Sequence, residues 1–233
     1  MSHVPLTISA GQSSGPSSAR LVLTLGVAGL LSGAALAGVY HITKPVIEAN
    51  EARALRGAVF KVVPGAFAVQ RYVLRDNRLA PVAEDELTSE PAIYAAYDEE
   101  GRFLAYAIEG AGPGFQDTIR LLYGYDPSQK QIVGLHILES RETPGLGDRI
   151  YKDAAFGENF KALAVHPKIV LVKDDRSSNN EVDAITGATI SSRAVVNILN
   201  SSNGQWLGRL PPPGQAPPRQ PPGPRAEDVT EGH

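Results

Sequence analysis

The feature that most constrains this chain is an uncharged apolar run over residues 21–40, close to the N-terminus. At ~1.5 Å per residue, a helix of this length would reach across the ~30 Å hydrocarbon core of a bilayer. The run therefore predicts a membrane-spanning helix. It separates a short N-terminal segment, residues 1–20, from the remainder of the chain.

The same run also fits a cleaved signal peptide, with Ala35-Leu36-Ala37 as a candidate cleavage site. Against cleavage, the run is long and the segment before it carries little positive charge. Gly29, Gly33 and Ala37 follow one another at helical-turn spacing, which suits close packing against another membrane helix. The sequence favours a retained anchor and keeps the signal peptide as the alternative.

The rest of the chain divides into one domain and a tail. Residues 43–210 have the length of a single domain of ordinary size. Residues 1–20 are rich in Ser and Gly and show no apolar periodicity, whereas residues 211–233 begin with a run of Pro, Gly and Gln. We expect the N-terminus to be disordered and the tail to be a disordered or polyproline-type extension, with partner binding as the alternative.

The composition excludes several classes of function. A formal net charge of −3 without basic clusters argues against a nucleic-acid-binding surface. The absence of cysteine excludes disulfides, thiolate metal ligands, iron–sulfur clusters and thiol nucleophiles. His136 and His166 have no partners at metal-ligand spacing, so we expect structural roles and no metal site. Any redox chemistry must come from a bound organic cofactor.

Hydrophobic periodicity predicts an α+β fold with an antiparallel sheet flanked by helices. A helix over residues 43–62 would begin at Thr43, with Pro45 in its first turn, and end at Pro64-Gly65. Strands are expected over residues 68–74, 92–97, 103–108, 118–123, 131–138 and 169–172, and helices over residues 150–163 and 193–199. The Gly-rich stretch over residues 109–114 is not a dinucleotide fingerprint, because no helix follows its glycines, and it is expected to be a hairpin or a loop at the rim of a site.

A motif of small residues, Asp183-Ala-Ile-Thr186-Gly187-Ala188-Thr189-Ile-Ser191, precedes the last predicted helix. Unpaired N–H groups and the helix dipole make such a position suitable for a phosphate, so a threonine there can cradle a phosphate or be esterified by one. The motif holds no His or Lys to act as a base, so esterification would need a separate enzyme. The alternatives are an ordinary N-capping Ser/Thr cluster and, for Asp183, a turn-capping role.

The motif resembles the flavinylation motif of bacterial FMN-binding domains. A second block, Glu142-Thr143-Pro144-Gly145-Leu146-Gly147-Asp148, is similar to the other hallmark loop of that family, and residues 43–50 are similar to its membrane-proximal segment. Over residues 21–210 the chain resembles the G subunit of the Rnf electron-transport complex. It also resembles a related protein, the C subunit of the sodium-pumping NADH:quinone reductase.

The resemblance implies a covalent cofactor. FMN would be bound by a phosphoester to Thr189, attached by a magnesium-dependent flavin transferase that takes the FMN moiety from FAD and leaves AMP. Leu146 would contact the flavin ring. The other expected cofactor-binding residues are Asp183, Thr186, Gly187, Ala188, Ser191, Glu142, Thr143, Gly145 and Gly147. No residue is expected to perform substrate chemistry of its own.

The resemblance also implies a setting. The chain would relay electrons in a translocase complex of the bacterial inner membrane that couples electron transfer between NADH and ferredoxin to ion movement. Its partners would be the other subunits, the flavin transferase and the bilayer. The alternatives are an anchored assembly module without a cofactor and a flavoprotein like the C subunit of the sodium-pumping quinone reductase.

Two arguments predict opposite orientations of the domain relative to the membrane. Lys44, Arg53 and Arg56 follow the apolar run, whereas Arg20 is the only basic flank before it, and the positive-inside rule then puts the domain in the cytoplasm. That rule weakens for long translocated domains. The resemblance implies a periplasmic domain, and we adopt that orientation as our prediction.

Overall fold

The computed structural model describes residues 17–75, 78–82, 90–173, 176–212 and 214–218. The chain divides into two compact units, residues 1–50 and residues 51–233. Disorder was predicted for residues 1–20 and for the tail, and residues 1–16 and 219–233 lie outside the described residues. The prediction is wrong for residues 18–20, which form the start of a helix.

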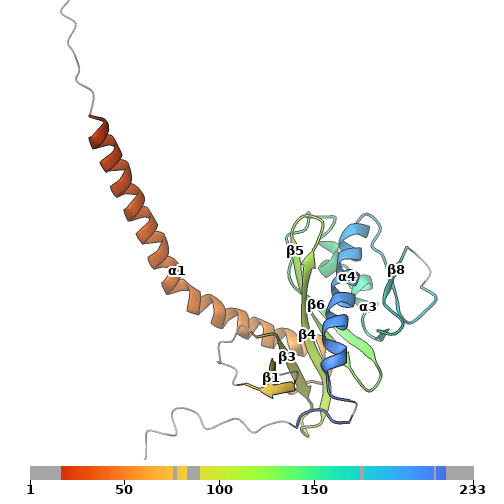
Figure 1. Ribbon diagram of the computed structural model, residues 1–233. Coiled ribbons are helices and arrows are strands. Elements are labelled where there is room, and N and C mark those ends of the chain that lie inside the picture. The colour runs from red at the N-terminus through yellow and green to blue at the C-terminus, as the bar shows by residue number, and fades with distance from the viewer. Residues whose placement is uncertain (1–16, 76–77, 83–89, 174–175, 213, 219–233) are drawn as a thin grey trace, which may run out of the picture. The chain divides into compact units, whose positions relative to one another are not determined.

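Helix α1 (Ser18–Val62) begins in the first unit and ends in the second (Figure 1). A separate helix starting at Thr43 was expected, and this is wrong, because the Thr43 hydroxyl donates to the Val39 carbonyl at 2.8 Å inside a continuous helix instead of capping a new one. Pro45 lies in the helix interior, where its missing N–H removes a single backbone hydrogen bond. The stretch Ser18–Ile47 is long and apolar enough to cross a membrane, and its most apolar window is not buried.

The second unit is built on an antiparallel sheet of seven strands in the order β2-β1-β3-β4-β5-β6-β7. The strands are β1 (Ala68–Arg75), β2 (Arg78–Pro81), β3 (Ala92–Tyr97), β4 (Phe103–Pro113), β5 (Thr118–Asp126), β6 (Gln131–Glu139) and β7 (Leu163–Ala164). A separate parallel pair is formed by β8 (Val170–Val172) and β9 (Glu181–Asp183). The predicted α+β fold with an antiparallel sheet flanked by helices is confirmed.

The Gly-rich stretch expected to be a loop is largely part of β4, which extends to Pro113. A Cβ on Gly110 would lie 2.5 Å from the Ser202 hydroxyl, and one on Gly112 would lie 2.8 Å from Ile198. Both contacts are with helix α4 (Thr189–Trp206). These glycines therefore allow a helix to pack closely on a strand. The hairpin alternative is confirmed, since β4 pairs antiparallel with β5. The loop alternative is wrong for residues 109–113, because composition alone does not distinguish close packing from a turn.

The helix predicted over residues 150–163 is also replaced by shorter elements. The structure has α2 (Arg149–Lys152) and α3 (Ala154–Glu158), followed by β7. Asp153 separates the helices in an extended conformation, and its side chain accepts a hydrogen bond from the Ala155 N–H at 3.0 Å. An aspartate that caps a new helix start ends the preceding one.

The sheet carries an apolar cluster on each face. On one face, α4 packs on β4 and β5 with buried Val195, Leu199 and Trp206 (Figure 1). On the other face, the end of α1 contributes Val59 and Val62 to a cluster with small residues of β3 and β4. Buried side chains along α4 therefore anchor it to the sheet from its first turns to Trp206.

Close approach of α1 to the sheet depends on a cross-strand pair of glycines. Gly124 and Gly134 lie directly opposite each other on β5 and β6. A Cβ on Gly134 would be 2.6 Å from the Val62 carbonyl oxygen, and one on Gly124 would clash with the same atom. The pair lets the last turn of α1 rest on the sheet.

The chain leaves α4 through a short 3₁₀ helix, η1 (Leu207–Arg209), and returns to the sheet. The Tyr97 hydroxyl donates to the Pro217 carbonyl at 2.8 Å. The described end of the Pro-rich tail, residues 214–218, is thus bonded to the domain, whereas a disordered or polyproline-type extension was expected.

Candidate functional site

The two loops singled out in the sequence lie against each other. Arg149 follows the first loop and donates from Nη1 to the Thr186 carbonyl of the second at 2.8 Å. Cδ2 of Leu146 lies 4.0 Å from the point where Gly187 would carry a Cβ. The fold therefore brings together the two sets of residues that the sequence predicted to share a site.

Glu142 is the centre of this arrangement. The residue is only 5% exposed, and Oε1 accepts hydrogen bonds from the N–H groups of Phe115 at 2.9 Å and Gln116 at 3.0 Å. The other oxygen, Oε2, accepts a short hydrogen bond from the Ser191 hydroxyl. One carboxylate thus joins the β4–β5 connection, the loop over residues 142–148 and the first turn of α4.

The ionisation of Glu142 reflects these bonds. Burial raises the pKa of its carboxyl, but the hydrogen bonds from Ser191 and from the N–H groups of Gln116 and Phe115 outweigh burial, and the pKa stays below its ordinary value. The group is therefore charged at neutral pH and acts as an acceptor for all three donors.

Small residues are needed around this carboxylate. A Cβ on Gly147 would lie 2.7 Å from Oε2 of Glu142 and 2.7 Å from the Ser191 hydroxyl oxygen. A Cβ on Gly114 would clash with Oε1 of Glu142. Glycine is thus required at position 147 because a side chain there would collide with the hydrogen-bonded pair Glu142 and Ser191. This requirement is stricter than the backbone torsion that a turn demands.

Thr189 is the first residue of α4, and it does not cap the helix. The N-cap residue is Ala188, which has no polar side chain. The side-chain hydrogen bonds at this helix start come from Ser192, whose hydroxyl accepts from the Ile185 N–H at 3.2 Å and donates to the Ala188 carbonyl at 3.0 Å. The Thr189 side chain is half-buried, and its hydroxyl makes no hydrogen bond to any residue that the structure describes. The N-capping alternative therefore does not apply to Thr189, and its hydroxyl is left for another partner.

Asp183 lies at the end of β9, six residues before Thr189. Its backbone N–H donates to Oδ1 of Asn159 at 3.0 Å, but its own Oδ1 is buried and has no partner among the described residues. Oδ1 of Asp183 therefore caps no turn among the described residues. A buried carboxylate oxygen without a donor beside the motif is an unused acceptor at the site.

Three large apolar side chains are exposed on the segments that Glu142 joins. Phe115 is 63% exposed, Leu146 53% and Ile190 57%. Large exposed apolar side chains on adjoining segments are candidates for a contact surface. Sequence reasoning identified Leu146 but not Phe115 or Ile190, since neither has a pattern of its own.

Hydrogen-bonding and charged side chains also lie around the two loops. The Thr143 hydroxyl donates to Oε1 of Gln116 at 3.1 Å, and Arg149 also pairs with Asp153 at 2.9 Å. Arg149 was missed by the sequence analysis, although its position directly after the first loop was a usable signal. No group of three or more His, Asp or Glu side chains among the described residues could hold a metal ion.

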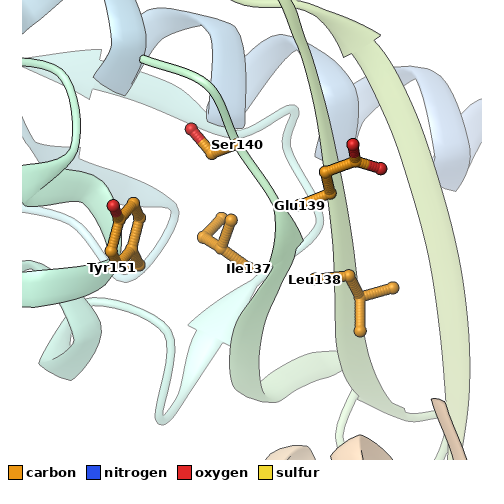
Figure 2. Close-up of a pocket in the computed structure, with 5 residues that line it drawn as sticks. All are labelled: Ile137, Leu138, Glu139, Ser140 and Tyr151. Atoms are coloured by element: carbon orange, nitrogen blue, oxygen red, sulfur yellow. The ribbon is translucent and has the colours of Figure 1, made fainter. Parts of the chain in front are cut away.

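A hollow of about 300 Å³ lies next to these loops, at the end of β6 and against α2. Figure 2 shows the ring of Tyr151 facing Ile137 across it, with Glu139 and Leu138 on the other side of the strand. Ser140 connects the hollow to the site, since its hydroxyl accepts from the Glu142 N–H at 3.3 Å. None of the predicted cofactor residues is among the residues that line the hollow.

His136, for which a structural role was expected, lies on β6 and contacts the last turns of α1. Its Nε2 lies 3.4 Å from Nζ of Lys61. Burial and the Lys61 ammonium lower the pKa of the imidazole, which keeps it neutral at physiological pH.

Comparison with known proteins gives matches across both loops. A family model described as the FMN-binding domain matches residues 114–202. The G subunit of the ion-translocating oxidoreductase complex of Haemophilus influenzae (strain PittEE) is 31% identical over 180 residues, covering 76% of this chain and 84% of that protein. The G subunit of the Na⁺-translocating ferredoxin:NAD⁺ oxidoreductase complex of Acetobacterium woodii is 27% identical over 186 residues, covering 78% and 88%.

The fold also has a counterpart among solved structures. The C subunit of the Na⁺-translocating NADH-quinone reductase from Parabacteroides distasonis superposes with a TM-score of 0.51 at 20% identity, covering 62% of this chain and 77% of that chain. At that identity, the likeness establishes the fold alone.

Proposed function

The chain belongs to the family of G subunits of ion-translocating oxidoreductase complexes, and from this membership we propose that it is the membrane-anchored flavoprotein subunit of such a complex, with FMN attached to Thr189. The observation that carries the attachment site is the Thr189 hydroxyl, which lies at a helix start, free of protein partners among the described residues and beside the loop that follows β6. FMN, when bound, supplies the electron-transfer chemistry. The chain supplies its position and surroundings and performs no substrate chemistry of its own.

Attachment is proposed to form a phosphoester at the threonine oxygen. That oxygen attacks the flavin-side phosphorus of FAD, the phosphoanhydride bond breaks, AMP leaves and the hydroxyl proton is released. No His or Lys lies within residues 183–192 to accept that proton. A separate flavin transferase is therefore the proposed partner for maturation, and it would need the exposed Thr186 and Gly187 to be accessible beside Thr189.

The residues present fit both ends of the cofactor. The first-turn N–H groups of α4 and the guanidinium of Arg149 beside Thr186 provide positive potential for a phosphate. Phe115, Leu146 and Ile190 offer exposed apolar surface for a flat ring. Glu142 and Ser191 do not face the cofactor in this proposal. Their bond holds the attachment threonine against the loop that supplies Leu146.

The proposed location of the protein rests on helix α1. We propose that Ser18–Ile47 anchors the protein in the membrane and that the domain faces the periplasm, where the bound flavin relays electrons between partner subunits of an NADH- and ferredoxin-linked complex. Covalent attachment suits that side, since FMN lost there could not be rebound from a cytoplasmic pool. A C-terminal fusion to a reporter enzyme that works only outside the cytoplasm is expected to be active. Activity of a reporter that works only in the cytoplasm would show the opposite orientation.

The attachment site is tested by expressing the full chain together with a flavin transferase. The wild-type protein is expected to give a flavin-fluorescent band on a denaturing gel, Thr189→Ala none, and Thr189→Ser a band, since serine keeps the hydroxyl. Thr118→Ala, at an exposed position in β5, is the matched control and should fluoresce like the wild type. A fluorescent Thr189→Ala band would refute the site, and a colourless wild-type band would favour an assembly module without a cofactor.

A further inference from the structure

The described end of the tail docks on β1 and β3 through hydrogen bonds to its backbone. The Tyr97 hydroxyl donates to the Pro217 carbonyl at 2.8 Å. The Tyr72 hydroxyl lies 3.2 Å from that of Tyr97 and is within reach of the Pro218 carbonyl at 3.4 Å. Two neighbouring phenols therefore face two consecutive proline carbonyls.

Aromatic rings form the surface behind these hydroxyls. Phe103 packs edge-on against Tyr97 with centroids 6.1 Å apart, and its centroid is 4.6 Å from that of Tyr106. Tyr72 and Tyr97 are each only 1% exposed with the tail in place. Aromatic grooves whose polar groups bind backbone carbonyls are the usual means of binding proline-rich segments. Proline suits such a surface because it is pre-ordered and has no N–H to leave unpaired.

A turn directs the chain into this surface. The Gln215 N–H donates to the Pro212 carbonyl at 3.0 Å, and Gly214, the third residue of the turn, has φ +81°. That torsion favours glycine, and the sequence has Pro213 before it, the pair that type II turns prefer. After the turn, Ala216 and Pro217 are half-buried. The tail is thus shaped to return to the domain.

We propose that Tyr72, Tyr97, Phe103 and Tyr106 form a proline-recognition site whose occupant is residues 216–218 of the same chain. The site covers the β1–β3 side of the apolar cluster that α4 shares with the sheet. It shares no residue with the proposed flavin site. Thr189 is at the start of α4, whereas the tail leaves from its other end, ~27 Å further along the helix.

The absence of cysteine provides a clean probe of docking. Ala216→Cys puts a single thiol on a half-buried residue of the docked segment, and its alkylation rate in the full chain reports the undocked fraction. We expect slow alkylation compared with the urea-unfolded chain. Adding Tyr97→Phe keeps the ring but removes the donor to Pro217, and the rate should rise roughly fivefold, as expected for a net hydrogen bond.

Tyr123→Phe is the matched control. It removes another buried phenol of the same cluster, which donates to Oδ1 of Asn203 at 2.9 Å and does not contact the tail. Its alkylation rate should equal that of the parent. Gly214→Val strains the turn without changing the tyrosines, so it should raise the rate, and Trp206 emission shows whether each variant is folded.

Three results would overturn the proposal. Alkylation as fast in the folded parent as in urea would mean that the tail is not docked. Equal rates for Tyr97→Phe and Tyr123→Phe would mean that the hydroxyl does not hold it. Protection that disappears on dilution would identify the occupant as the tail of a second copy.

Discussion

Replacing Glu142 by glutamine should loosen the three segments that its carboxylate joins. Hydrogen bonds to a charged acceptor contribute ~1.5–3 kcal/mol and neutral ones ~0.5–1.5 kcal/mol, so each bond should lose ~1 kcal/mol in an isosteric change. The three bonds share one acceptor group and are not additive, and the Ser191 hydroxyl can turn to accept from the new amide. We therefore expect a loss of about 2 kcal/mol in the free energy of unfolding.

The assay is urea unfolding of the full chain followed by Trp206 emission. Trp206 is the only tryptophan and is 4% exposed in the cluster under α4, so its emission reports the globular unit. Glu139→Gln is the control, because that side chain is 47% exposed and lies 3.6 Å from Arg120, a surface pair worth at most ~1 kcal/mol. Equal shifts in the two variants would refute the role assigned to Glu142.

Three further outcomes are expected. Since the pKa of Glu142 is lowered in the folded state, its stabilisation is present above the unfolded pKa of about 4.3 and is lost as the pH falls through the folded pKa. The difference in urea midpoint between wild type and Glu142→Gln should therefore shrink below about pH 4, and a constant difference would contradict this. Gly147→Ala should cost about 1–3 kcal/mol and lower flavin loading, because its Cβ intrudes between the loops, whereas Gly157→Ala, with no atom within 4 Å of the new Cβ, should be neutral in the same urea titration. Arg149→Ala should slow flavin attachment in a time course without abolishing it, because the Thr186 carbonyl loses its donor; an unchanged rate would remove Arg149 from the site.

Much of the sheet could be predicted because its strands alternate locally. The strand over residues 92–97 was predicted with the bounds that the structure has, and β1, β5 and β6 begin where expected. The short strands β2, β7 and β9 were missed, because two to four residues carry too little periodicity to indicate a strand.

The remaining differences come from features that the local sequence pattern does not reveal, namely the packing of distant segments and the continuation of a helix. Gly110 and Gly112 look like loop residues until α4 is packed on them. Thr43 looks like an N-cap until the helix before it continues and offers the Val39 carbonyl. The tail looks free until Tyr97 supplies a donor for Pro217.

The candidate site was accessible to sequence reasoning in one respect. Resemblance identified both loops, and the structure brings them together at Glu142 and Ser191. Phe115 and Gln116 could not be predicted, because they contribute backbone N–H groups and any residue type provides those. The role of Thr189 remains a prediction of motif and geometry together.

The most direct test of FMN attachment to Thr189 is a mass measurement on the peptide that contains this residue. Trypsin releases residues 177–193 as one peptide, which also holds Thr186 and Ser191, so fragmentation is needed to locate any modification. Attachment of FMN to Thr189 predicts an added mass of one FMN less water, confined to fragments that include Thr189. An unmodified peptide from protein expressed with a flavin transferase, or the same added mass on Thr186 or Ser191, would contradict it.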